Sequence, residues 1–258
     1  MWNQDRYYPI NGKELPSVTT ILKVIDKSGP LVAWAVKEER NAFKQAMSQV
    51  LSKGTVFGVP PETILRQLEE ATTGIKASDK LLVKAGDIGT MVHALIENHS
   101  RKELGLALVD LERDPTEEER GAYEVWKLWA KACEYKPISI ETVVYDEALG
   151  FAGRFDSYAL VHGKKSIVDV KTSSRIFPEM FLQVAAYRHG AEMRGMACEQ
   201  VVLIRLPKTL DDHCYEEKIL TDTIRAFDAF LHCLSLWRWL KEQKENQKKV
   251  LAPKQEEA

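Results

Sequence analysis

In the first half of the chain, apolar residues recur at the spacing of amphipathic helices. Ser17 follows Pro16 and is a residue type that commonly caps a helix N-terminus. The pattern predicts helices over residues 18–25, 31–51, 61 onward, 78–102 and 116–135. Gly86 and Gly89 allow a break near the middle of the fourth helix.

The second half of the chain changes to the alternating pattern of β-strands. Residues 138–145, 151–161 and 166–171 predict three consecutive strands. Pro178 begins a helix that we expect to end near Gly195. Two further strands, over 200–206 and 213–220, and a closing helix over 221–243 complete the pattern.

These elements divide the chain into three expected parts. An N-terminal helical region takes residues 1–77, and a core of strands and helices takes residues 78–243. Residues 244–258 are rich in Lys, Gln and Glu, a composition typical of a disordered charged tail.

Composition restricts the function classes only moderately. Of the 258 residues, 45% are hydrophobic and 29% are charged, as in an ordinary globular protein. The net charge is −2, so a surface that binds nucleic acid must be a local one. No apolar run of about 18 residues predicts a membrane-spanning helix, and the first residues lack the pattern of a signal peptide. We therefore expect a cytoplasmic protein.

The four cysteines are widely and irregularly spaced. None of them forms a C-x-x-C pair, which argues against a zinc or iron–sulfur site. We expect free thiols and no iron–sulfur cluster. The cysteines are Cys133, Cys198, Cys214 and Cys233.

Acidic and basic residues on two neighbouring strands carry the candidate chemistry. Asp169 and Lys171 share one face of their strand. A two-residue hairpin loop at residues 162–163 would set Asp156 opposite Asp169, and a four-residue loop would set it opposite Lys171. Either register places the three side chains on one side of the sheet, whereas a slip of one residue would separate them. The alternative is a solvated strand face with an ordinary ion pair.

Such a pair of carboxylates needs a positive partner. Two carboxylates about 4 Å apart repel by roughly 4 kcal/mol at an effective dielectric constant of 20. Mg²⁺ or Mn²⁺ is the natural partner, because hard dications prefer carboxylate oxygens. The ion would polarise a phosphate and activate water, and Lys171 would orient that water or neutralise developing charge.

Two helices carry further polar pairs. Gln183 and Tyr187 are four residues apart and share a helix face, where they would hold a phosphate or orient the metal site. His93 and Glu97 share a face of an earlier helix, and His93 would supply an imidazole to the same metal, which favours Mn²⁺ slightly. The alternatives are an ordinary amphipathic helix and a structural histidine.

Four motifs together resemble the PD-(D/E)XK nuclease superfamily and look most like its RecB-type exonuclease branch. They are Gly89-Thr90-x-x-His93, Gly153-x-x-Asp156, Asp169-x-Lys171 and Gln183-x-x-x-Tyr187. Residues 15–22 and Trp34 are also similar to bacteriophage exonucleases and the mitochondrial genome maintenance exonuclease. The resemblance implies an α/β, restriction-endonuclease-like fold, with a central mixed sheet flanked by helices and an N-terminal helical region.

The resemblance also implies a role for each motif residue. His93, Asp156, Asp169 and the Val170 carbonyl would bind the metal, and Lys171 would be the catalytic lysine, supported by Gln183 and Tyr187. Asp169 stands where a glutamate is common and is shorter by a methylene. Glu97 and Glu141 are candidates for supporting acids near the metal, or else surface glutamates.

The expected activity is that of a metal-dependent DNA exonuclease in replication, recombination or repair, phage-encoded if the second resemblance holds. Single strands or duplex ends would be bound by local basic and aromatic groups. Candidates are Lys80, Lys84, Arg154, Arg175, Arg205 and Trp34. The alternatives are a structure-specific endonuclease, a catalytically silent nucleic-acid-binding module on the same fold and a metal-binding structural protein.

Overall fold

The structure is a computed structural model that describes residues 5–26, 28–52, 60–72, 77–209, 212 and 214–251. The chain forms two compact units. The first comprises residues 1–25 and 89–258, and the second comprises residues 26–88. These units differ from the expected division after residue 77, because the two strands and the short helix within residues 7–21 contact the sheet at Phe151–Val161.

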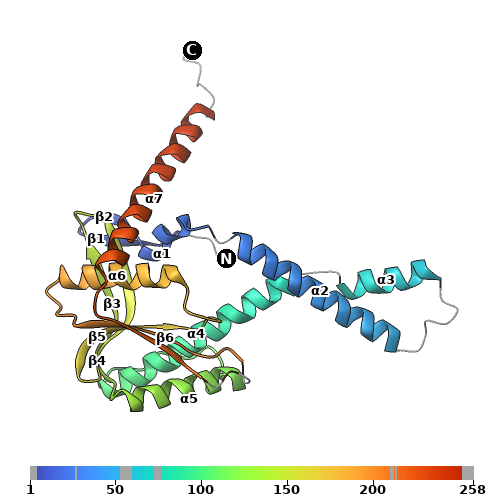
Figure 1. Ribbon diagram of the computed structural model, residues 1–258, viewed down its shortest axis with the longest axis horizontal. Helices are drawn as coiled ribbons and strands as arrows, with labels where there is room; N and C mark the ends of the chain where they lie inside the picture. Colours follow the sequence, from blue (N-terminus) through green and yellow to red (C-terminus); the bar gives the residue numbers. More distant parts are fainter. Residues whose placement is uncertain are drawn as a thin grey trace. The chain divides into compact units, whose positions relative to one another are not determined.

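A five-stranded mixed sheet is the centre of the first unit (Figure 1). Its strands lie in chain order: β3 (Lys136–Asp146), β4 (Phe151–Val161), β5 (Lys164–Lys171), β6 (Gln200–Arg205) and β7 (Glu216–Leu220). All neighbours are antiparallel except β5 and β6, which are parallel because α6 (Pro178–Glu192) crosses between them. The predicted α/β fold, with a central mixed sheet flanked by helices and an N-terminal helical region, is confirmed.

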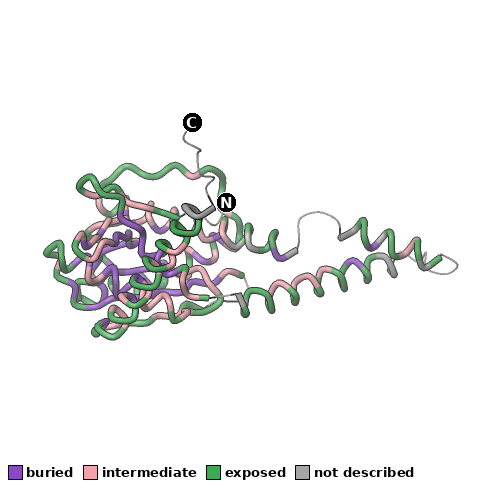
Figure 2. Tube along the Cα trace, turned by 90° about the horizontal axis from the view of Figure 1, so that it is seen from above, coloured by how far each residue is buried: buried purple, intermediate pink, exposed green. Residues whose placement is uncertain are grey.

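Helices cover both faces of this sheet. α6 packs against β3, β4, β5 and β6 on one face, and α5 (Glu117–Ala132) lies on the other (Figure 1). The buried residues of the described chain concentrate in this unit (Figure 2). Phe151, Phe155 and Phe230 are fully buried in its core, and α7 (Ile224–Leu251) contributes the last of them.

Two helices differ in detail from the sequence pattern. α4 (Ala77–Glu103) continues through Gly86 and Gly89, so the break that these glycines allow does not occur. α7 reaches Leu251, so residues 244–251 extend a helix instead of belonging to a disordered tail. The remaining part of the expected tail, 252–258, lies outside the described residues.

β1 (Tyr7–Ile10) and β2 (Lys13–Pro16) form a hairpin that the predicted elements did not include. Asn11 and Gly12 form its turn, with φ of 48° and 77°. An Asn-Gly pair is the strongest short-range hairpin signal, so the sequence contained the necessary information. α1 (Val18–Ile21) follows, and the Ser17 side chain accepts the Thr20 N–H at 3.0 Å, which confirms the predicted cap.

The second unit is helical. It holds α2 (Ser28–Ser52), α3 (Pro61–Thr72) and the first turns of α4. Glu39 of α2 accepts hydrogen bonds from the backbone N–H and the hydroxyl of Ser78, at 3.1 and 3.0 Å. The first of these bonds satisfies a backbone donor in the first turn of α4, where helical N–H groups have no partner within the helix.

A buried carboxylate fixes the start of α5. The Thr116 hydroxyl accepts the Glu119 N–H and Glu119 accepts the Thr116 N–H, which together form a capping box. Arg113 donates to both Glu119 oxygens, at 2.8 and 2.6 Å. These hydrogen bonds, chiefly those from Arg113, outweigh burial and lower the pKa of Glu119.

Glu119→Gln tests this arrangement, because the new amide places a donor against the Arg113 guanidinium. We expect a loss of about 1 to 3 kcal/mol in the free energy of unfolding at pH 7. Because the folded-state pKa of Glu119 is lowered, its ionised carboxylate stabilises the folded protein fully at pH values above the unfolded pKa of about 4.3. The difference in unfolding free energy between wild type and variant should therefore shrink as the pH falls below that value. Urea unfolding of both proteins between pH 7 and pH 3 measures this.

Glu124→Gln is the matched control on the same helix. Its carboxylate is exposed and pairs with Lys127 at 2.7 Å, so its loss costs at most about 0.5 kcal/mol. Equal losses in the two variants would contradict the role given to Glu119.

Candidate active site

Strands β4 and β5 pair only along part of their length. The ladder runs from Val161 and Lys164 to Ser157 and Val168, so residues 162–163 form a two-residue loop. The loop has the register that sets Asp156 opposite Asp169. Beyond Ser157, β4 continues along β3 while β5 continues along β6, and the two strands separate.

The Asp156 carboxylate lies in the fork between these strands. Its Oδ2 accepts the backbone N–H of Val170 at 2.6 Å, and its Oδ1 lies 3.3 Å from Nδ1 of His93 on α4. Burial lowers the pKa of His93, but the charge and hydrogen bond of Asp156 outweigh it, and the pKa is raised. Burial by itself would raise the pKa of Asp156. The nearby His93 and Lys171 outweigh burial, so the pKa of Asp156 is lowered.

Asp169 and Lys171 form the second charged pair. Lys171 Nζ lies 2.6 Å from Asp169 Oδ2, and Asp169 is only 3% exposed. The direction of this contact does not meet hydrogen-bond geometry, so Oδ2 is a buried oxygen that accepts no hydrogen bond within the described residues. Burial and the nearby Asp156 charge raise the pKa of Asp169 despite the attraction of Lys171.

Gln183 and Tyr187 of α6 complete a chain of polar contacts. Lys171 Nζ donates to Gln183 Oε1 at 3.0 Å, and Gln183 Nε2 donates to the Tyr187 hydroxyl at 2.7 Å. The hydroxyl therefore keeps the amide oxygen turned towards Lys171. Burial raises the pKa of Tyr187 well above its ordinary value, so the hydroxyl stays neutral.

Two motif glycines let the helices approach the strands. A Cβ on Gly153 would lie 2.8 Å from Cδ1 of Tyr187 and 3.2 Å from Cγ2 of Val18. A Cβ on Gly89 would lie 2.8 Å from the hydroxyl oxygen of Thr172, which follows β5. Real Cβ atoms essentially never approach other atoms within 3 Å, so a side chain at Gly153 would have to displace the Tyr187 ring and one at Gly89 the Thr172 hydroxyl.

Glu141 also faces the site. The pairs on either side of it in the β3–β4 ladder set it opposite Asp156, and its Oε2 lies 2.8 Å from Nε of Arg154. Burial and the Asp156 charge raise the pKa of Glu141. Glu97 accepts from Nε of Arg101 at 2.7 Å, and its charge also contributes to the raised pKa of Glu141.

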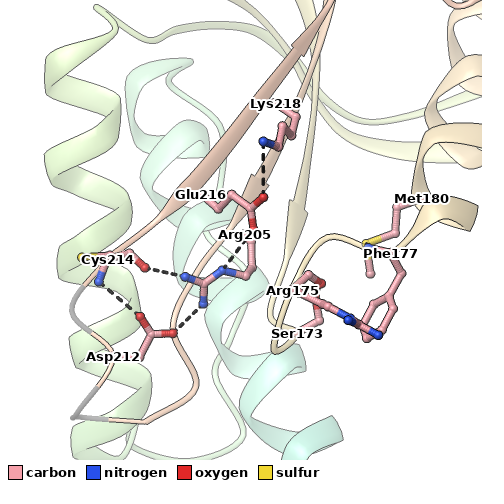
Figure 3. A network of polar contacts seen from close by, with 9 residues as sticks. All are labelled: Ser173, Arg175, Phe177, Met180, Arg205, Asp212, Cys214, Glu216 and Lys218. Atoms are coloured by element: carbon pink, nitrogen blue, oxygen red, sulfur yellow. Dashed lines mark hydrogen bonds and ion pairs between the residues drawn. The ribbon is translucent and has the colours of Figure 1, made fainter. Parts of the chain in front are cut away.

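The basic residues proposed to contact DNA occupy different settings. Arg154 is held by Glu141, and the exposed Arg175 lies over the Phe177 ring, 5.0 Å from its centroid (Figure 3). Trp34, Lys80 and Lys84 belong to the second unit, and their role in DNA binding stays a prediction. Lys84 is exposed and Trp34 is half-buried, and the Lys80 side chain lies outside the described residues.

Arg205, at the end of β6, is the most buried of the basic candidates whose side chains the structure describes. It is 8% exposed, and its guanidinium contacts Asp212 at 2.6 Å, the Cys214 carbonyl at 2.9 Å and Glu216 at 3.9 Å (Figure 3). These contacts tie β6 to β7 and to the segment between them. The guanidinium is already surrounded by acceptors, so Arg205 has a structural role between β6 and β7, and its predicted contact with DNA stays a prediction.

The fit of the site to a metal rests on few groups. No three His, Cys, Asp or Glu side chains of the described chain are arranged to hold an ion together. Mg²⁺, however, commonly uses one or two carboxylates and completes its shell with water and substrate phosphates. The buried Asp169 Oδ2, which lacks a hydrogen bond, the adjacent Asp156 and the carbonyl of Val170 are oxygen donors of the kind such an ion takes.

The four cysteines are free thiols in the structure. Cys133 and Cys198 are buried, and burial raises the pKa of Cys133 to about 12. None of the described helices is long and apolar enough to cross a membrane.

The residues that hold α6 against the sheet were not among the predicted ones. His189 of α6 lies 2.8 Å from Asp146 at the end of β3 and stacks on Phe227 of α7, with ring centroids 4.1 Å apart. No local pattern marks this pair, because 43 residues separate its members. The contact of Val18 with Gly153 was not predicted either. A glycine in a strand indicates that another group comes close, but it does not identify that group.

The chain has distant structural relatives among exonucleases. It resembles an alkaline exonuclease from Laribacter hongkongensis, with 12% identity and a TM-score of 0.32, over 48% of this chain and 70% of that one. It also resembles a phage-related exonuclease from Haemophilus somnus 129PT, with 13% identity and a TM-score of 0.32, over 58% of this chain and 83% of that one. No family model and no curated protein matches the sequence.

Gly153→Ala tests the contact between β4 and Tyr187. The new methyl group would displace the Tyr187 ring, so we expect the free energy of unfolding to fall by about 1 to 3 kcal/mol. Denaturant unfolding measures this loss. In a Tyr187→Ala background the same substitution should cost much less, because the ring that it displaces is absent.

Gly29→Ala is the control. A Cβ at Gly29 in α2 has no atom within 4 Å, and alanine favours a helix by up to about 1 kcal/mol. A Gly153→Ala protein as stable as this control would refute the close contact.

Proposed function

We propose that this protein is a metal-dependent DNA exonuclease of the PD-(D/E)XK, RecB-like type, which hydrolyses phosphodiester bonds. The observation that carries the proposal is the meeting of Asp156, Asp169 and Lys171 at the fork between β4 and β5. A buried carboxylate, a half-buried one and a lysine held by a helix are more than a solvated strand face requires. The biological setting that we propose is DNA replication, recombination or repair, in the cytoplasm of a cell or of a phage-infected host.

The metal-binding residues in this proposal are His93, Asp156, Asp169 and the Val170 carbonyl. Bound Mg²⁺ or Mn²⁺ supplies Lewis-acid stabilisation of the phosphate and lowers the pKa of an attacking water. Asp156 is already oriented by the Val170 N–H and by His93. This preorganisation reduces the cost of placing the carboxylate when substrate arrives.

Lys171 is the catalytic lysine of the proposal. Asp169 and Gln183 hold its ammonium group, so its donors have a fixed direction beside the proposed phosphate position. A fixed positive charge stabilises the negative charge that develops on the phosphate oxygens in the transition state. Gln183 and Tyr187 act as positioning residues through Lys171.

The decisive experiment incubates the protein with end-labelled single- and double-stranded DNA and with Mg²⁺, Mn²⁺ or EDTA. We expect mononucleotide or short products with either ion and none with EDTA. Asp169→Asn and Lys171→Ala should each lower the rate at least about 100-fold, because each removes charge from the reacting centre.

Asp110→Asn and Lys164→Ala are matched controls, since both residues are exposed and outside the site. They should cleave at the wild-type rate. If the folded wild-type protein cleaves no DNA, the result would favour the catalytically silent binding module. If the ion still binds to such a protein, a metal-binding structural protein would also fit. Cleavage of a circular substrate would favour the structure-specific endonuclease.

Tyr187→Phe tests the positioning of Lys171. Without the hydroxyl, the Gln183 amide loses the partner that orients it, so we expect kcat to fall about 10- to 100-fold with little change in KM. Tyr123→Phe is the control, because it removes a hydroxyl that contacts His99 on the opposite side of the sheet from α6. An unchanged kcat in Tyr187→Phe would mean that the chain from Tyr187 to Lys171 has no role in the reaction.

A further inference from the structure

A pocket of about 380 Å³ lies where α7 passes the N-terminal hairpin and α1 (Figure 1). Three lysines, two aromatic rings and one acid are among the residues that line it. They are Lys23, Lys241, Lys244, Tyr7, Trp237 and Asp5. The lining therefore carries an excess of two positive charges, in a protein whose net charge is −2.

Aromatic rings hold the Lys241 ammonium group. Its Nζ lies 5.4 Å from the centroid of Tyr7 and 5.3 Å from that of Trp237. Cation–π attraction fixes the position of an ammonium without using up its N–H donors on an acceptor. No ion pair of Lys241 or Lys244 occurs within the described part of the chain, whereas Lys23 pairs with Asp5 at 3.0 Å.

The elements that line the pocket also reach the candidate active site. Thr20 of α1 lines the pocket, and Val18 of the same helix borders Gly153 and the Tyr187 ring. Tyr7 lines the pocket as well, and the neighbouring Tyr8 is close enough to Tyr187 to influence its pKa. The hairpin and α1 therefore contribute residues both to the pocket and to the surroundings of Tyr187.

We propose that this pocket binds a phosphate group of a nucleic-acid strand, through Lys241 and Lys244. The identification of that strand as substrate rests on the proposed nuclease function. A phosphate fits because it accepts several hydrogen bonds from ammonium groups and is attracted by the excess positive charge. The same chemistry would accept the phosphate of a free nucleotide, so the experiment needs an arm for each source.

The test measures binding by fluorescence anisotropy in EDTA, where no cleavage occurs, with a labelled single-stranded oligonucleotide and, separately, a labelled mononucleotide. Each single-strand phosphate contact contributes about 0.7 to the slope of log affinity against log salt concentration. Lys241→Gln and Lys244→Gln should each lower that slope by about this amount, and the affinity about fivefold at 0.1 M salt. Both lysines are exposed on α7, so Lys244→Gln should keep the wild-type thermal unfolding curve. Lys241→Gln should lower the unfolding midpoint slightly, because it also loses the contacts with Tyr7 and Trp237.

Lys136→Gln is the matched control, an exposed lysine at the start of β3 that makes the same charge change outside the pocket. It should leave affinity and slope unchanged. Loss of oligonucleotide binding in the pocket variants assigns the pocket to the strand, and loss of mononucleotide binding alone assigns it to a free nucleotide. Wild-type affinity and slope for both ligands in both variants would overturn the proposal.

Cleavage assays with metal separate this proposal from the nuclease function. If the protein binds the strand through these lysines but never cleaves it, the phosphate pocket is supported and the proposed nuclease activity is contradicted. If the protein cleaves DNA while both variants bind like wild type, the nuclease activity is supported and the phosphate pocket is contradicted.

Discussion

The candidate site depends on the separation of β4 and β5 beyond Ser157 and Val168. At this fork the Val170 N–H donates to the Asp156 carboxylate, which fills the gap between the strands. The bond brings Asp156 beside Asp169 in a buried space, where like charges repel strongly. His93 and Lys171 supply the opposing charges, and the raised pKa of Asp169 shows that they offset the burial and the repulsion only in part.

The helices around the fork convert this local charge arrangement into a fixed geometry. α4 brings His93 to Asp156 because Gly89 admits the close approach of Thr172. α6 brings Gln183 to Lys171 because the Tyr187 ring rests where Gly153 has no side chain. In both cases a missing methyl group sets the distance between a helix and the sheet, and close-packed interiors transmit such distances with little slack.

Much of the site was predictable because its members are close in sequence or have a definite strand parity. A two-residue loop requires Asp156 to stand opposite Asp169, whatever lies around them. Arg205 shows the limit of this reasoning, since a basic residue at a strand end looks available until Asp212 and Glu216 surround it. The hairpin at Asn11 was predictable in principle, because its Asn-Gly turn is a local signal.

The amino-acid sequence by itself determined the order of helices and strands, the spacing of the acidic residues and the glycines at which close contact is required. These are local properties, set by backbone preference and side-chain period. Only the tertiary structure decided which side chains meet: His189 with Asp146, Tyr187 with Gly153, and Lys241 with Tyr7. Such contacts join residues that are dozens to hundreds of positions apart, so they depend on how all the elements pack and leave no periodic trace in the chain.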